Sequence, residues 1–66
     1  MDIIINGESC SVPAGYTAAQ LVASLGLAGR RIAMEVNQHI VPRSSYATHV
    51  FSAGDRIEIV HAVGGG

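Results

Sequence analysis

The stretch that decides the fold is Thr17-Ala18-Ala19-Gln20-Leu21-Val22-Ala23-Ser24-Leu25-Gly26-Leu27, which has the pattern of a capped helix. Thr17, with Gln20 three residues later, forms a capping box, which is the signature of a helix start. Apolar residues at helical spacing predict one buried stripe, made of Ala18, Leu21, Val22 and Leu25. Gly26 is expected to end the helix, with Leu27 closing back on Val22. The sequence therefore predicts one main helix near residues 18–25.

Strand-like segments precede the helix. Residues 3–5 are three isoleucines, and β-branched residues favour a strand. Asn6-Gly7 follows, and this dipeptide predicts a tight hairpin because both residues tolerate positive φ. Residues 8–12 alternate polar and apolar, which places Cys10 and Val12 on the inward face.

Further strands are predicted after the helix. Residues 32–36 alternate, residues 40–41 form a short strand, and residues 50–51 are a candidate for another. Residues 56–61 form the last strand. Inward positions are expected at Ile32, Met34, Val36, Ile57 and Ile59, with Tyr46 as a further anchor in the core. We expect an α+β fold in which one main helix packs on one face of a mixed sheet, with the first and last strands placed centrally.

Composition limits the function. The chain has 66 residues and a formal net charge of −1, which fit one small domain without an electrostatic case for nucleic acid. A domain of this size has a thin core, so a deep catalytic cleft is not expected. No apolar run reaches the length of a membrane span, and no leader is apparent. The single cysteine cannot form an internal disulfide, which fits a reducing cytoplasm.

The sequence ends with a strand-like run that leads into Gly64, Gly65 and Gly66. Glycine leaves the α-carboxylate of Gly66 unhindered and lets the backbone lie against another protein. Four extended residues from Val63 span roughly 13–14 Å, enough to carry the carboxylate off the folded body. No lysine is present, so no side chain can accept an isopeptide bond. The same glycines also fit a frayed chain end, and the tail pattern alone leaves both interpretations open.

Short motifs stand at separate places along the whole chain. They are Asn6-Gly7, Ala14-Gly15-Tyr16-Thr17, Val36-Asn37-Gln38-His39-Ile40-Val41-Pro42-Arg43, Gly54-Asp55 and Gly65-Gly66. Together they resemble the ThiS family, the small sulfur carriers of thiamin thiazole biosynthesis, which have a β-grasp, ubiquitin-like fold. The run from Val36 to Arg43 is the most specific part, whereas the di-glycine end is shared by β-grasp carriers generally. The resemblance implies a β-grasp domain over residues 1–63 and a flexible glycine tail over residues 64–66.

The resemblance also implies a reaction cycle at the last residue. A ThiF-type adenylating enzyme would use Mg-ATP to convert the Gly66 carboxylate to an acyl-adenylate. Sulfur from a persulfide donor, such as a cysteine desulfurase, would replace AMP and leave a C-terminal thiocarboxylate. Thiazole synthase (ThiG) would then take that sulfur. The carrier itself would bind no cofactor and contribute no catalytic side chain. The three glycines depart from the commonest ending of the family, which leaves the role of Gly64 open.

Partner contacts are expected on the tail and on the sheet face without the helix. Gly64 and Gly65 would thread into a partner's active site. Ile4 and Val60 are expected to point away from the helix. The candidate interface residues are Ile4, Val60, Ala62 and Val63.

Other reactive side chains have a simpler interpretation. Cys10 could relay sulfur, but its inward position favours a buried, inert thiol. His39, His49 and His61 show no ligand spacing, so no metal site is predicted. Arg43 is expected to be structural or to lie at an interface.

Two alternative functions remain from the sequence. The small subunit of molybdopterin synthase shares the fold, the tail and the sulfur chemistry, but it is generally longer and lacks the pattern of residues 37–43. The other alternative is a ubiquitin-like interaction module without sulfur chemistry. Sulfur loading by an activating enzyme would separate carriage from binding, and the choice of client enzyme would separate the two carriers.

Overall fold

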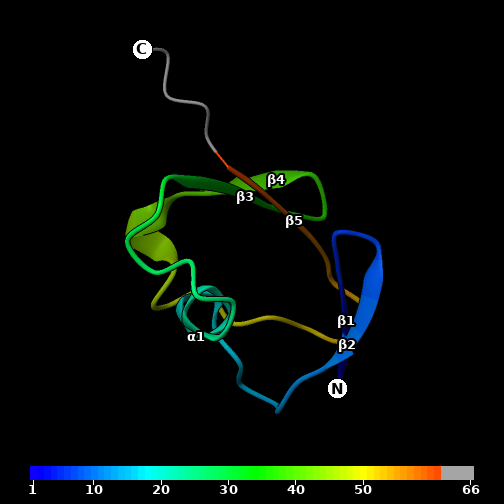
Figure 1. Cartoon of the computed structure of the whole chain (residues 1–66). Helices are drawn as coiled ribbons and strands as arrows, with labels where there is room; N and C mark the ends of the chain where they lie inside the picture. Colours follow the sequence, from blue (N-terminus) through cyan, green and yellow to red (C-terminus); the bar gives the residue numbers. More distant parts are fainter. Residues whose placement is uncertain (62–66) are drawn as a thin grey trace.

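The computed structural model describes residues 1–61, in which one α-helix packs on one face of a five-stranded sheet (Figure 1). The strands are β1 (Asp2–Ile5), β2 (Glu8–Ser11), β3 (Ile32–Val36), β4 (His39–Val41) and β5 (Arg56–His61). The helices are α1 (Ala18–Ser24) and the single-turn 3₁₀ helix η1 (Arg43–Ser45). The predicted α+β fold with one main helix is confirmed.

The sheet is mixed, with the strand order β2-β1-β5-β3-β4. β1 and β5 run parallel, and the other neighbours run antiparallel. The last strand is central and the first strand lies beside it, as predicted. Residues 50–51 do not form a strand, which corrects the sequence interpretation. Val50 makes only an isolated bridge to Thr17, because the chain enters α1 directly after Thr17 and offers no longer partner.

Both hairpins close with two-residue turns at positive φ. Asn6 and Gly7 have φ values of 48° and 85°, and they join β1 to β2. Asn37 and Gln38 have φ values of 52° and 70°, and they join β3 to β4. Positive φ at both central residues matches the right-handed twist of the flanking strands, which fixes each register.

The ends of α1 follow the predicted capping pattern. The Thr17 hydroxyl accepts a hydrogen bond from the Gln20 N–H at 3.2 Å, and the Gln20 side chain accepts one from the Thr17 N–H at 2.8 Å. At the other end, Gly26 has a φ of 71°, and the Leu27 N–H donates to the Val22 carbonyl at 2.9 Å. This pairing is the Schellman arrangement, and it stops the helix.

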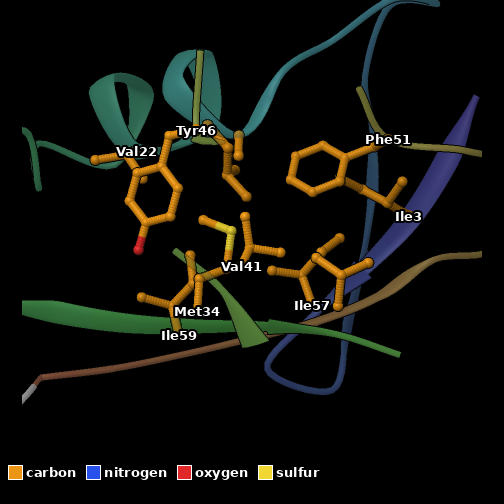
Figure 2. Packing of buried hydrophobic residues seen from close by; sticks show 11 residues of the cluster. Ile3, Val22, Met34, Val41, Tyr46, Phe51, Ile57 and Ile59 are labelled. Atoms are coloured by element: carbon orange, nitrogen blue, oxygen red, sulfur yellow. The ribbon is translucent and has the colours of Figure 1, made fainter. Parts of the chain in front are cut away.

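The core lies between α1 and the sheet (Figure 2). Figure 2 shows Val22 and the rings of Tyr46 and Phe51 opposite Met34 and Ile57 of the sheet. The buried cluster consists of Ile3, Ala18, Leu21, Val22, Met34, Val36, Val41, Tyr46, Phe51, Ile57 and Ile59. Tyr46 is therefore the core anchor that the sequence predicted.

In the helix and the third strand, Leu25 and Ile32 are less buried than predicted. Leu25 is 47% exposed although it belongs to the helical stripe, because it is the C-cap residue and lies beyond the covered part of α1. Ile32 is only partly buried, at the first position of β3. In the described part of the chain, no helix is both long and apolar enough to cross a membrane.

Candidate functional site

β5 ends at His61, and the three terminal glycines follow shortly after it in the sequence. β5 pairs with β3 from Ile57, which lies opposite Val36, to His61, which lies opposite Ile32. Figure 1 shows β5 between β3 and β1, with His61 as its last residue. Ala62, Val63, Gly64, Gly65 and Gly66, which include the predicted sulfur-carrying residue, lie outside the described residues. The described part of the site is therefore the surface around the end of β5.

Val60 is the most prominent predicted site residue on this surface. Its side chain is 60% exposed on the sheet face that α1 does not cover, since its neighbour Ile59 points into the core. Opposite Val60 on β3 lies Ala33, which is also exposed. Ala33 is not among the predicted interface residues, although its place in the alternating run 32–36 assigns it to the outward face. Val60 and Ala33 form a small apolar surface near the end of β5.

Ile4 shares the helix-free face with Val60 but does not contact that small apolar surface. Ile4 pairs with Arg56 at the start of β5 and is partly buried. Val60 lies four residues further along β5, which corresponds to about 13 Å of strand. The polar side chain of Arg56 lies beside Ile4, and that of Glu58 lies between Ile4 and Val60 on the same face. The structure thus places the two predicted residues on one face but at opposite ends of β5.

Two carboxylates border the Val60 surface. Glu35 on β3 and Glu58 on β5 are direct cross-strand partners on the helix-free face. Like charges directly opposite one another are unfavourable in a sheet. Because Glu58 is exposed and Glu35 is only partly buried, solvent screens the repulsion. The small apolar surface of Val60 and Ala33 is therefore bordered by two negatively charged side chains.

The motif residues away from the tail have structural roles. The Asn37 side chain accepts a hydrogen bond from the Arg56 N–H at 3.0 Å and donates to the Asp55 carboxylate at 3.0 Å. Asp55 also accepts from the Ser52 N–H at 2.8 Å. The two motifs Asn37 and Gly54-Asp55 therefore meet at the start of β5 and lock the β3–β4 turn onto it.

Arg43 also links two segments of the body. Its guanidinium donates a hydrogen bond to the Arg30 carbonyl at 2.6 Å, which ties η1 to the loop that follows α1. A planar guanidinium with several donors suits this bridging of backbone groups. Of the two roles that the sequence leaves open for Arg43, the structure shows the structural one.

Cys10 is less buried than predicted. It pairs with Ile3 across the first hairpin and packs against the core, but its exposure is intermediate. The reason is that β2 is an edge strand, so only one of its sides is covered by another strand. Cys10 lies on the β1–β2 hairpin, whereas β5 ends at His61, opposite Ile32 of β3 (Figure 1).

The histidines lie on separate elements. His39 begins β4, His61 ends β5, and His49 packs edge-to-face on Phe51 with 5.5 Å between ring centroids. Among residues 1–61, no group of His, Cys, Asp or Glu is arranged to hold a metal ion.

Comparison with solved structures defines the class of the protein as a β-grasp domain. The crystal structure of a thiamine biosynthesis protein (ThiS) from Geobacter metallireducens matches with a TM-score of 0.85, over 100% of both chains and at 23% identity. A solution structure of a thiamine biosynthesis protein from the same organism matches with a TM-score of 0.75, over 100% of this chain and 88% of that one.

The chain belongs to the ThiS family. The family model matches residues 3–66. The sulfur carrier protein ThiS of Escherichia coli (strain K12) is 33% identical over 66 residues, with 100% of both chains covered. The resemblance predicted from the sequence motifs is therefore confirmed.

Two further relatives are longer proteins named thiazole synthase. The one from Paramagnetospirillum magneticum is 44% identical over 66 residues, and the one from Magnetococcus marinus is 41% identical over the same length. In both cases the match covers 100% of this chain, which spans 20% of the length of the relative.

Proposed function

We propose that this protein carries sulfur as a thiocarboxylate on Gly66 and delivers it to a thiazole synthase. The observation that supports this most strongly is the family match, which extends from residue 3 through the terminal glycine at 66. The resemblance assigns the catalytic groups to partner enzymes, and the carrier supplies reach and lack of bulk.

The chemistry runs in three steps. A carboxylate oxygen of Gly66 attacks the α-phosphorus of Mg-ATP on a ThiF-type enzyme, forming the acyl-adenylate and releasing pyrophosphate. The terminal sulfur of a persulfide donor, such as a cysteine desulfurase, then attacks the acyl carbon and expels AMP, which gives an acyl disulfide. A thiol cleaves that disulfide, and the thiocarboxylate leaves as the reduced product while the thiol becomes part of a new disulfide. A carboxylate is a poor electrophile until one of its oxygens becomes part of a good leaving group, and AMP is that leaving group here.

The client enzyme is supported by the two longer relatives. Both are named thiazole synthase, and each contains a region that matches this whole chain. A carrier domain and the enzyme that uses its sulfur gain effective concentration when they share one chain. We propose that this chain binds a thiazole synthase and delivers sulfur to it, as the matching region would do within each longer relative.

The docking surface that we propose is the helix-free face at the end of β5, together with the tail. Val60 supplies exposed apolar area there, and Ala62 and Val63 follow it directly in the sequence. Ile4 extends the same face toward the start of β5. Gly64 and Gly65 would then enter the partner's channel, where only backbone fits.

Sulfur loading can be followed by intact mass. With a ThiF-type enzyme, Mg-ATP, a persulfide donor and a thiol, we expect the mass to rise by the difference between one sulfur and one oxygen atom. After proteolysis, the gain should lie in the C-terminal peptide. Gly66→Leu keeps a terminal carboxylate but adds bulk, and it should not be loaded. A wild-type chain that gains no sulfur, or a Gly66→Leu chain that is loaded as fast as wild type, would contradict the proposal.

A further inference from the structure

The side chain of Asn6 holds the backbone of β5 at Ile59. Its Oδ1 accepts a hydrogen bond from the Ile59 N–H at 2.9 Å, and its Nδ2 donates to the Ile59 carbonyl at 3.2 Å. These partners are 53 residues apart in the sequence. One carboxamide therefore satisfies both backbone groups of a single residue in the last strand.

This double contact continues the ladder between β1 and β5. The backbone rungs end with the Asn6 N–H, which donates to the Ile57 carbonyl at 2.9 Å. After Asn6 the chain turns away into β2, so no further backbone group of β1 faces β5. A carboxamide carries one acceptor and one donor side by side, as a peptide group does. The Asn6 side chain thus makes the next pair of hydrogen bonds to β5, in place of the backbone groups that turn away.

The extra rung lies near the end of β5. Among residues 1–61, Val60 and His61 are paired in the sheet with β3 alone, through Ala33 and Ile32. Ile59 is therefore the last residue of β5 that is held from both sides.

We propose that Asn6 is a positioning residue that sets the path along which β5 delivers the tail to the adenylating enzyme. The inference rests on the proposed function, since it concerns the carboxylate of Gly66. In-line attack on phosphorus requires the carboxylate to lie within bonding reach of the nucleotide, and a misplacement of about 1 Å can cost up to about 100-fold in rate. Asn6 acts through Ile59 and does not itself meet the nucleotide.

The structure offers a matched control in Asn37. Asn37 is also the first residue of a two-residue hairpin turn, with a φ of 52° against 48° for Asn6. Its carboxamide also accepts from a β5 N–H, that of Arg56. Arg56 begins β5, whereas Ile59 lies near its end. Glycine suits positive φ, so Asn6→Gly and Asn37→Gly remove the carboxamides while keeping both turns.

The first experiment needs no partner enzyme. In Asn6→Gly, we expect the Ile59 amide to exchange about tenfold faster, and the order parameters of Val60 and His61 to fall from about 0.85 toward about 0.6. In Asn37→Gly, the Arg56 amide should exchange faster while Val60 and His61 keep their order. Equal order parameters in the two variants would overturn the inference.

The second experiment measures adenylation of each chain by a ThiF-type enzyme, as pyrophosphate release. For Asn6→Gly we expect kcat to fall about tenfold while KM changes less than twofold, because the docking face is intact and only tail delivery is impaired. Asn37→Gly should keep both constants within twofold. If wild type is adenylated and both variants match it, Asn6 does not position the tail. If wild type itself is not adenylated while the order parameters separate the variants, the proposed function fails and the anchoring role of Asn6 stands.

Discussion

Leu21 and Leu25 belong to the same stripe of α1 but differ sharply in burial, at 2% and 47% exposed. We expect Leu21→Ala to lower the free energy of unfolding by about 2–5 kcal/mol, since it leaves a cavity against the sheet. Leu25→Ala should cost below about 1 kcal/mol, because the side chain already meets water. Urea titration of both variants measures the difference.

The comparison is informative because the two substitutions are chemically identical and only four residues apart. Equal losses would mean that Leu25 is buried in solution and that α1 continues beyond its C-cap. A loss of the size expected for Leu21 is a large part of the stability of so small a domain.

At the scale of single residues, the sequence predicted turn chemistry well and side-chain bridges poorly. Asn6 was recognised as a turn residue because the Asn-Gly dipeptide is a local signal. Its contact with Ile59 was missed, since that contact joins residues 53 positions apart and leaves no periodic pattern. From the sequence, Asn37 and Asp55 stand out only as parts of family motifs. The structure shows their structural role, since the Asn37 side chain donates a hydrogen bond to the Asp55 carboxylate at 3.0 Å.

At the scale of elements, the end of β5 carries the proposed docking surface. Val60→Arg should leave the melting temperature nearly unchanged, because the side chain is 60% exposed. It should lower kcat/KM for adenylation by about 100-fold, the size expected when a charge is left unpaired in a buried interface. Val50→Arg is the matched control, since Val50 is 53% exposed but lies outside the strands of the sheet.

Adenylation kinetics and thermal scans on the same preparations decide the assignment. If Val50→Arg and Val60→Arg reduce adenylation equally, the effect comes from charge and not from the face. If Val60→Arg is adenylated as fast as wild type, the docking surface lies elsewhere.

The elements themselves were predictable to differing degrees. The capping box, the stripe and Gly26 are all local signals, and they predicted α1 to within a residue. The strands around Asn6-Gly7 and residues 37–38 followed from alternation and turn residues. The prediction of a strand at residues 50–51 was wrong because two apolar residues are too few to show a periodic pattern. Their pairing is decided by a distant segment, since Val50 makes an isolated bridge to Thr17 at the start of α1. The parallel pairing of β1 with β5 was likewise a tertiary outcome.

At the scale of the whole molecule, the folded body and the reactive end should respond to different substitutions. In the described chain, every buried apolar residue lies between Ile3 and Ile59. Gly65 and Gly66 have no side chains to bury, so deleting both should shift the melting temperature by less than about 2 °C. Cys10→Ser removes a sulfur that packs against the core, and a loss of about 1 kcal/mol would lower it by about 4–8 °C in a domain of this size.

Sulfur loading should respond in the opposite way to the melting temperature: the truncation should abolish loading, and Cys10→Ser should not affect it. Cys10→Ser should gain sulfur at the wild-type rate, because Cys10 lies on the edge hairpin and the reaction requires only the terminal carboxylate. The truncated chain should gain none, although it retains a carboxylate on Gly64, because it lacks two residues of reach, about 7 Å. Intact mass after loading and a thermal scan of each variant test both halves of the prediction. Sulfur bound to Cys10 in the truncated chain would show that the thiol is the carrier. Loss of loading in Cys10→Ser, while the variant is still folded at the assay temperature, would assign the thiol a relay role that its edge position does not predict.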